Sequence, residues 1–430
     1  MHHVILGAGP AGVIAAETIR KHAPADTITL VGDEKEPPYS RMAIPYLLMG
    51  NVPERGTYLR KGATHFADLK INVVQARAKQ VDATAKTVKL DNGITVAFDT
   101  LLLATGSQPV RPPIPGIDAA GVHPCWTLED ARAIMLLATK GARVLQLGAG
   151  FIGCIIMEAL AARGVHLSVV EMGDRMVPRM MGPTAGGMIR DWCEAKGVEV
   201  FTGTRVEAIE AGSPLSVRLS NGKHMSADLV ISAAGVKPAI GFLENSGVTC
   251  LLGVLTDEHL QTNVPGIYAA GDCAEAFDKV YGKTIVSAIQ PNAAEQARVA
   301  ALNMVAFGRG TAPRAELKGV TQINVLDTLG LISASFGEWQ GVPGGEHVEL
   351  TDKAAGRHLS LQFKDDVMVG CNSVGWTDHV GVMRGLVEGQ IHLGAWKETL
   401  KTDPTKLMDA YLACAQGQGE WSGAQDQRRR

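Results

Sequence analysis

The chain has 430 residues, of which 46% are hydrophobic and 20% are charged, and these are ordinary values for a globular protein. At roughly 150 residues per domain, this length predicts about three domains. Lys and Arg total 41 against 44 Asp and Glu, and the net charge of −3 argues against nucleic acid as the main partner. No apolar run reaches the roughly 18 residues that a membrane helix needs, so we expect no membrane partner.

Cysteine usage points to a reducing compartment. The seven cysteines are widely spaced and include no C-x-x-C pair, which excludes the common signatures of zinc ribbons, redox dithiols and iron–sulfur clusters. His123, His347 and His392 lack metal-ligand spacing, so no metal site is predicted. Because the N-terminus has no signal-peptide pattern, we expect a cytoplasmic protein with reduced thiols.

The N-terminal segment has the pattern of a strand, a glycine turn, a helix and a second strand. Residues 4–6 predict a buried strand, residues 13–22 a helix and residues 27–31 the next strand. The turn at residues 7–12 reads G-x-G-x-x-G, in which the first glycine permits the turn, the second admits a pyrophosphate and the third lets helix pack on strand. Amides at the helix N-terminus then face the phosphates, so a bound dinucleotide is favoured over a ligand-free turn.

The segment after this unit is rich in short strands. Asp33 and Glu34 follow the second strand, where carboxylates accept hydrogen bonds from ribose hydroxyls. Residues 109–116 are rich in proline and predict an extended linker. The intervening strands are predicted at residues 71–75, 79–82, 87–90, 94–98 and 101–103.

A second unit of the same kind begins near residue 143. It has a strand at residues 144–147, a G-x-G-x-x-G turn at residues 148–153, a helix and another strand at residues 166–170. Glu171 ends that strand, and a carboxylate there suits the free 2′-hydroxyl of NAD and repels the 2′-phosphate of NADP. Arg175 lies close by and either softens this preference or is a solvated surface charge. Two such turns predict two dinucleotides, a bound flavin and an exchanging nicotinamide.

The last part of the chain has a different pattern. A strand at residues 229–232 ends in Ala233-Ala234-Gly235, and a strand at residues 267–270 precedes Gly271-Asp272. From about residue 316, strand-like runs and a helical end predict a separate α+β domain. These strands lie at residues 321–325, 359–363 and 367–369, and the helix at residues 406–415.

Between about residues 3 and 310 the chain resembles the FAD-dependent pyridine nucleotide–disulfide oxidoreductases. The resemblance rests on the two glycine turns with Glu171, on residues 102–106 and on residues 266–272, all in the right order. It implies an α/β fold with two Rossmann-like, three-layer ββα dinucleotide-binding domains and a C-terminal α+β domain. The implied bounds are residues 1–110 and 245–315 for a discontinuous FAD-binding domain, 111–244 for the NAD-binding domain and 316–430 for an interface domain.

The resemblance also assigns roles near the flavin. Asp272 would hydrogen-bond the ribityl chain, although a helix N-cap ahead of Ala274 is an alternative or additional role. Gly235 would lie beside the nicotinamide. The helix start at residues 290–298 would point at the flavin pyrimidine, where its dipole stabilises negative charge. Cys273 is expected to be structural.

Residues 38–46 look like the flavin-adjacent stretch of ferredoxin-, rubredoxin- and nitrite-reductase-type members, in which Arg41 matches an arginine that contacts FAD. Met42 stands where coenzyme A-disulfide reductases and NADH peroxidases carry a catalytic cysteine, and a thioether cannot form a thiolate. The C-x4-C redox disulfide is also absent. Tyr46 replaces a lysine of the ferredoxin-reductase type and either faces the flavin or simply packs. Ile155 replaces a glutamate of many relatives, and Glu158 is not assumed to substitute for it.

These arguments predict two sets of cofactor-binding residues and no catalytic side chain, since hydride transfer needs no general acid or base. The residues predicted to bind FAD are Gly7, Gly9, Pro10, Ala11, Gly12, Asp33, Glu34, Arg41, Ala104, Thr105, Gly106, Gly271, Asp272, Pro291, Gln296 and Ala297. The residues predicted to bind NAD are Gly148, Gly150, Phe151, Ile152, Gly153, Glu171 and Gly235.

The leading functional prediction is an FAD-dependent NAD(H) oxidoreductase that exchanges electrons with an iron–sulfur protein or subunit, as part of a hetero-oligomer or homodimer. Residues 150–158 and 170–175 look most like the flavin subunits that accompany tungsten aldehyde oxidoreductases. The alternatives are a stand-alone NADH oxidase or diaphorase and a redox-sensing flavoprotein that acts through binding. Apolar and aromatic residues of the last domain either face a partner or, preferably, fill that domain's own core. These residues are Trp376, Trp396, Leu407, Met408 and Tyr411.

Overall fold

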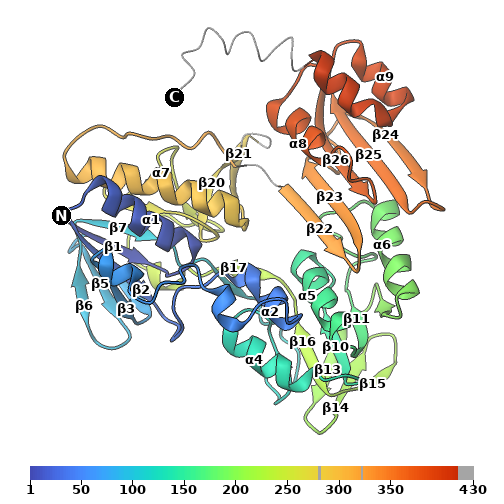
Figure 1. Ribbon diagram of the computed structural model, residues 1–430, viewed down its shortest axis with the longest axis horizontal. Coiled ribbons are helices and arrows are strands. Elements are labelled where there is room, and N and C mark those ends of the chain that lie inside the picture. The colour runs from blue at the N-terminus through green and yellow to red at the C-terminus, as the bar shows by residue number, and fades with distance from the viewer. Residues whose placement is uncertain (279–281, 321–322, 415–430) are drawn as a thin grey trace. The chain divides into compact units, whose positions relative to one another are not determined.

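The computed structural model describes residues 1–278, 282–320 and 323–414 (Figure 1). The chain divides into two compact units, Met1–Val110 with Val236–Val320, and Arg111–Gly235 with Thr321–Arg430. The first unit takes up the chain again at Val236, not at residue 245, and the C-terminal region clusters with the second unit. The three-domain division therefore stays a prediction.

A parallel five-stranded sheet, in the order β19-β7-β1-β2-β3, forms the centre of the first unit. In β1, Ile5 lies between Leu30 of β2 and Leu102 of β7. The central strands β1, β2 and β7 carry buried apolar runs, as expected where both faces of a sheet are covered, whereas the edge strand β3 is mostly exposed. Their bounds are β1 His2–Leu6, β2 Thr27–Gly32, β3 Ile71–Gln75, β7 Thr100–Leu103 and β19 Ile267–Ala269.

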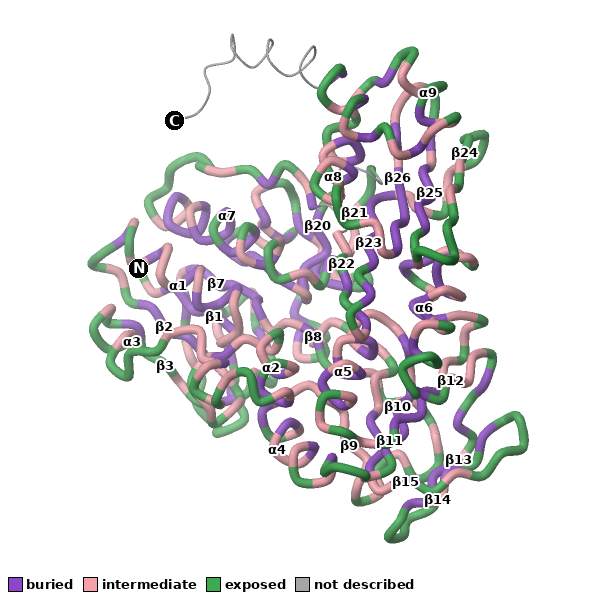
Figure 2. The backbone as a smooth tube through the Cα atoms, turned by 45° about the vertical axis from the view of Figure 1, so that its right-hand side comes forward, coloured by how far each residue is buried: buried purple, intermediate pink, exposed green. Residues whose placement is uncertain are grey.

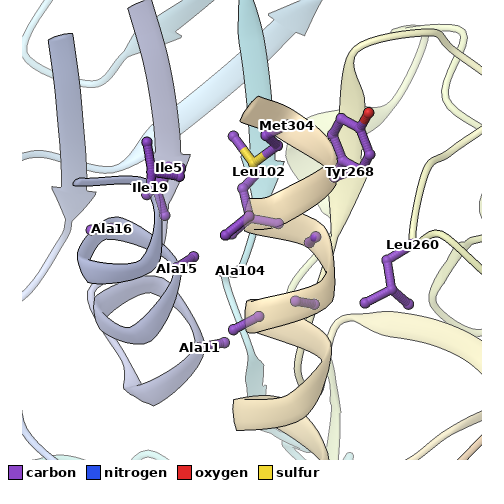
Figure 3. Packing of buried hydrophobic residues seen from close by; sticks show 14 of the residues in the cluster. Ile5, Ala11, Ala15, Ala16, Ile19, Leu102, Ala104, Leu260, Tyr268 and Met304 are labelled. Carbon is purple, nitrogen blue, oxygen red and sulfur yellow. The ribbon is translucent and has the colours of Figure 1, made fainter. Parts of the chain in front are cut away.

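The two faces of this sheet are covered by different layers. Helices α1 (Pro10–His22) and α7 (Gln290–Gly308) pack on one face around Ile5 and Leu102 (Figure 3). The antiparallel sheet β4-β5-β6 covers the other, where its Val88 joins the core of Val4, Leu6 and Leu103. The unit therefore has the predicted three-layer ββα arrangement. The covering strands are β4 Ala78–Asp82, β5 Thr87–Leu90 and β6 Thr95–Ala97.

Smaller elements complete the first unit. Strand β8 (Ser107–Pro109) pairs antiparallel with β17 (Val236–Pro238), so the chain leaves this unit and returns to it at one short ribbon. The strands β18, β20 and β21 form a three-stranded sheet. The remaining bounds are η1 Arg41–Ala43, α2 Ile44–Leu48, η2 Glu54–Thr57, α3 His65–Asp68, η3 Gly241–Leu243, β18 Val254–Leu255, β20 Ala274–Asp278 and β21 Lys283–Val286.

The second unit repeats the parallel design. Its sheet has the order β12-β11-β10-β16-β9, and Leu145 of β10 lies between Ser168 of β11 and Val230 of β16. The antiparallel sheet β13-β14-β15 covers one face with Val217, and β10 and β11 are largely buried (Figure 2). The bounds are β9 Val122–His123, α4 Leu128–Leu137, β10 Arg143–Leu147, α5 Phe151–Ala162, β11 His166–Val170, α6 Pro183–Ala195, β12 Glu199–Phe201, β13 Val206–Glu210, β14 Leu215–Leu219, β15 His224–Ala227 and β16 Leu229–Ser232.

The C-terminal part of the second unit is an antiparallel sheet in the order β22-β23-β26-β25-β24. Strand β22 packs against α5 and strand β26 against α6. Residues 407–414 are helical, while residue 415 of the predicted helix lies outside the described residues. Leu407 is buried, as expected if this helix fills its own core. The bounds are β22 Ile323–Thr328, β23 Leu331–Gly337, β24 Glu346–Asp352, β25 Arg357–Lys364, β26 Val367–Val374, α8 Val380–Gly389, α9 Trp396–Thr402 and η4 Pro404–Lys406.

Candidate functional site

The first glycine turn, between β1 and α1, leaves room where a phosphate would lie. A Cβ atom on Gly7 would lie 2.0 Å from the carbonyl oxygen of Ala104, and one on Gly12 would lie 1.8 Å from the carbonyl oxygen of Gly7. A Cβ on Gly9 would meet no described atom within 4 Å, and Gly9 has a φ of −79° that any residue adopts. The protein's own packing thus requires Gly7 and Gly12, whereas Gly9 borders open space.

The second glycine turn, between β10 and α5, has the same geometry. A Cβ on Gly148 would lie 2.5 Å from the carbonyl oxygen of Ala233, and one on Gly153 would lie 2.5 Å from that of Gly148. A Cβ on Gly150 would again meet no described atom within 4 Å, at a φ of −76°. Space beside the middle glycine is what the close approach of a pyrophosphate requires.

Both helices that follow these turns begin with backbone amides that lack a side-chain cap among the described residues. Gly9 and Gly150 are the N-cap residues of α1 and α5, and no side chain of the described residues caps either helix. The first amides of each helix and the positive end of its dipole therefore remain for an anionic group. The residues present fit one dinucleotide pyrophosphate at each turn.

The two acidic residues after β2 have different partners. Asp33 is exposed and accepts a hydrogen bond from Arg77 Nε at 2.9 Å. Glu34 pairs with Arg41 at 2.6 Å and also accepts a hydrogen bond from the Tyr39 hydroxyl. Arg41 donates to that hydroxyl at 2.8 Å as well. Glu34 and Arg41, predicted separately from the sequence, therefore lie together at the end of β2.

The carboxyl ends of β7 and β19 bring further predicted residues to the same edge of the first sheet. Ala104, Thr105 and Gly106 follow β7, and the Thr105 hydroxyl donates to the carbonyl oxygen of Ala239 at 2.8 Å. Gly271 follows β19 with a φ of +82°, and its amide donates to Gln296 of α7 at 2.7 Å. Pro291 and Ala297 lie on α7, which also carries Gln296. In parallel α/β sheets, ligands bind outside the carboxyl ends of the strands.

Asp272 is a largely buried carboxyl at this edge. Burial raises its pKa, while the Ser107 hydroxyl, which donates to it at 2.8 Å, and the charge of Arg41 oppose that shift. The expectation that Asp272 caps a helix is wrong, because Ala274 begins strand β20. Ser107 was not predicted, although its position directly after Gly106 is the signal that places it here.

Glu171 is held at the second turn by backbone amides. Its carboxylate accepts hydrogen bonds from Ala149 at 2.7 Å and from Gly173 at 2.7 Å. Arg175 is turned to other partners, because its guanidinium donates to the carbonyl oxygen of Met181 at 2.9 Å and to Asp174 at 2.7 Å. These bonds engage two donors of the guanidinium, and the preference for NAD over NADP stays a prediction.

Other predicted residues flank the second turn. Phe151 and Ile152 are half-buried in the first turn of α5, and Gly235 follows β16 with a φ of +99°. Ile155 is half-buried on α5. Burial and the charge of Asp327 raise the pKa of Glu158 on α5. That Glu158 does not replace the glutamate of relatives stays a prediction.

The stretch predicted to lie by the flavin presents an apolar surface. Met42 is 52% exposed in η1 and Tyr46 is 53% exposed in α2. Tyr46 is therefore not a core side chain. All seven cysteines are free and Cys273 is fully buried, and its structural role stays a prediction. The described residues contain no group of three His, Cys, Asp or Glu placed to hold a metal ion, and no helix among them is long and apolar enough to cross a membrane.

Two ββα units, each with a glycine turn that fits a pyrophosphate, define a protein that binds two dinucleotides. Residues 1–301 match the pyridine nucleotide-disulphide oxidoreductase family, and the chain belongs to that family. Members of the family are enzymes that use FAD and NAD(H), which confirms the predicted enzyme class, cofactors and fold.

Known proteins similar to the chain have related activities. It is 33% identical over 417 residues to the epsilon subunit of NADH-dependent phenylglyoxylate dehydrogenase from Aromatoleum evansii, covering 96% of this chain and 94% of that protein. It is 31% identical over 315 residues to an NADH oxidase from Methanocaldococcus jannaschii, covering 71% and 70%. The ferredoxin reductase for the CYP199A2 system from Rhodopseudomonas palustris superimposes with a TM-score of 0.77 at 27% identity, covering 87% and 91%. These relatives support a coarse role in NAD(H)-dependent electron transfer.

Proposed function

We propose that this chain is the FAD- and NAD-binding subunit of a larger oxidoreductase, which exchanges electrons between NAD(H) and an iron–sulfur partner. The observation that carries the proposal is the pair of glycine turns with open space at Gly9 and Gly150. The chain has Met42 where the resemblance places a reactive cysteine in other members, so a thiol mechanism is not proposed. The similarity over 96% of the chain to a dehydrogenase subunit supports the larger complex, and the ferredoxin reductase supports the iron–sulfur partner.

The chain's own residues bind and orient the two cofactors. The α1 amides, Glu34 with Arg41, and Asp272 would hold FAD, and the α5 amides with Glu171 would hold NAD. Bound FAD supplies hydride exchange with the nicotinamide and the release of electrons one or two at a time. The protein contributes position and electrostatics, and no side chain needs to act as a nucleophile. Tungsten-dependent aldehyde oxidation by another subunit remains the finer part of this proposal.

Substitution of the second turn's glycines tests the NAD site. In Gly150→Ala the added methyl enters open space, so we expect unchanged thermal unfolding of the NAD-free protein but at least about tenfold weaker NAD⁺ binding by calorimetry, because phosphate approach is lost. Gly153→Ala is the matched control, since its methyl collides with the Gly148 carbonyl and lowers the unfolding temperature as well. Normal NAD⁺ affinity in Gly150→Ala would contradict the assigned site.

Electron acceptors distinguish the proposal from its main alternative. The purified flavin-loaded chain should reduce an iron–sulfur protein with NADH much faster than it reduces oxygen. Rapid NADH consumption with oxygen alone would instead favour a stand-alone oxidase, which the similarity to an NADH oxidase supports. Purification from native cells should yield co-purifying subunits and metals. Isolation of the chain alone and metal-free would contradict the larger complex, and a complex without tungsten would contradict only the aldehyde oxidoreductase assignment.

A further inference from the structure

The segment after β11, residues 171–182, forms hydrogen bonds with the backbone of the second glycine turn, and we call it the bracing loop. Its first residue, Glu171, accepts the hydrogen bond of the Ala149 amide, and Val177 in its middle donates to the carbonyl oxygen of Ala149 at 2.8 Å. Both backbone groups of Ala149, which lies between Gly148 and Gly150, are therefore bonded to this loop. The shape of the turn depends on the shape of the loop.

Val177 holds an unfavourable backbone conformation in that loop. Its φ of +49° lies in the left-handed region, which β-branched residues rarely adopt, and it is 1% exposed. Its carbonyl oxygen accepts hydrogen bonds from the amides of Met180 and Met181, both at 2.9 Å. A residue in such a conformation keeps it only where its surroundings hold it firmly. Met180 and Met181, at the end of the bracing loop, supply that restraint through these two hydrogen bonds.

Asn372 of strand β26 fastens the end of the bracing loop. Its side-chain oxygen accepts a hydrogen bond from the Gly182 amide at 2.9 Å, and its side-chain nitrogen donates to the carbonyl oxygen of Met180 at 2.9 Å. The amide group thus bonds backbone groups on both sides of Met181. Asn372 is 2% exposed, so water does not compete for these bonds. Asn372 therefore links the C-terminal sheet to the loop by two side-chain hydrogen bonds.

We propose that Asn372 is a positioning residue for NAD, which holds the bracing loop, and through Val177 the Ala149 peptide, in the shape that receives the dinucleotide. This inference rests on the proposed function of the second glycine turn. It gives the C-terminal sheet a part in nucleotide binding in addition to any part in docking a partner. Loss of the two Asn372 hydrogen bonds should weaken NAD binding and leave the predicted flavin site, in the other unit, unaffected.

Asn372→Asp tests the role with almost no change in size. The carboxylate of this variant can still accept from Gly182 but would face the Met180 carbonyl with a second acceptor. At about pH 8 we expect the Kd for NAD⁺, measured by calorimetry on the flavin-loaded chain, to rise about five- to tenfold. With ferricyanide as acceptor, the KM for NADH should rise similarly while kcat and flavin content stay close to those of the unsubstituted chain.

The pH dependence of this variant separates positioning from general damage. Burial raises the pKa of the introduced carboxyl, and its protonated form regains a donor for Met180, so NAD⁺ affinity should recover towards about pH 6. Ser335→Ala is the matched control, because Ser335 lies opposite Asn372 on β23, is 1% exposed, and its hydroxyl has no partner among the described residues. We expect this control to bind NAD⁺ normally at both pH values.

The outcomes are distinguishable. Failure of the unsubstituted chain to bind NAD⁺ would contradict the proposed function and this inference together. Normal NAD⁺ affinity in Asn372→Asp, with thermal unfolding unchanged, would contradict only the role of Asn372. Equal weakening in Asn372→Asp and Ser335→Ala, without recovery at lower pH, would show loss of sheet stability and would also overturn the assignment.

Discussion

Asp272, predicted to bind FAD, is expected to lower the free energy of unfolding when its carboxyl is charged. Its carboxyl is buried at the end of β19, and that burial raises its pKa above the ordinary 3.8, although Ser107 and Arg41 stabilise the charged form. A carboxyl with a raised folded-state pKa binds its proton more tightly when folded. Its contribution to stability therefore decreases as the pH rises from below 3.8 through the folded pKa.

We therefore predict opposite effects of Asp272→Asn on stability and on FAD binding. The flavin-free variant should unfold at a higher temperature than the unsubstituted protein at pH 7 and should lose the difference near pH 4, whereas its FAD affinity should fall. Thermal unfolding across this pH range, with flavin titration, measures both. Ser107→Ala is the control, because it removes the bond that stabilises the charge and should lower the neutral-pH unfolding temperature. A lower unfolding temperature for Asp272→Asn at pH 7 would contradict the argument.

At the scale of elements, the contact between α1 and α7, which we call the seam, fixes the helix that is predicted to receive the first pyrophosphate. Small side chains fill it, with Ala11 and Ala15 of α1 lying next to α7 (Figure 3). Ala297 and Ala300 of α7 are fully buried in the same cluster. Because these side chains are short, the two helices pack closely and leave no volume for a larger residue.

Ala15→Leu should force this seam apart. We expect a loss of about 1–3 kcal/mol in the free energy of unfolding of the first unit, from overpacking, together with weaker FAD retention as the α1 N-terminus shifts. Urea unfolding followed by flavin fluorescence measures both quantities. Lys21→Leu places the same side chain on the exposed side of α1 and should leave both unchanged. Unchanged stability in Ala15→Leu would show that the seam has spare volume.

At the scale of the whole molecule, the distribution of thiols excludes a thiol relay. Five of the seven cysteines are buried, and Cys125 and Cys250 are half-buried. Burial raises the pKa of Cys125 to about 12, and that of Cys193 to about 12, so these thiols stay protonated at neutral pH. The half-exposed Met42 carries a thioether, not a thiol, in the stretch predicted to lie beside the flavin.

Alkylation tests this account of the thiols. Treatment of the native flavin-loaded chain with iodoacetamide should leave the rate of ferricyanide reduction by NADH unchanged, because no thiolate takes part. Met42→Cys provides the contrast, since its half-exposed thiol should be alkylated faster than the seven native cysteines, as mass spectrometry would show. Loss of activity on alkylation of the unsubstituted chain would reveal an essential cysteine.

Features that depend on local rules could be predicted from the sequence. The glycine turns were predictable because Gly7 and Gly148 need positive φ and Gly12 and Gly153 leave no room for a side chain. The strands at residues 71–75, 87–90 and 229–232 match β3, β5 and β16. Their continuous or alternating apolar runs specify them directly.

Features that depend on distant partners could not be predicted. Strands β8 and β17 contain prolines and have low strand propensity, and each exists because the other, more than a hundred residues away, pairs with it. Asn372 gave no signal, because a buried amide is recognised only through Met180 and Gly182, which lie far away in sequence. The binding roles of the predicted site residues stay predictions until the variants above are measured.

The chain leaves the first unit after β8 and returns to it at β17, and this interruption affects the order in which the nascent chain can fold. All five strands of the second parallel sheet lie between residues 122 and 232, so this sheet is complete while α7 has not yet been translated. The first sheet needs β19 and α7, and α7 begins roughly 180 residues after Val110, or roughly 10–35 s at ribosomal rates of about 5–20 residues per second. Until β19 is made, β7 can pair only with β1, and until α7 is made the alanine face of α1 lacks its helical partner. The N-terminal segment is made first, but its sheet is the later of the two to be completed.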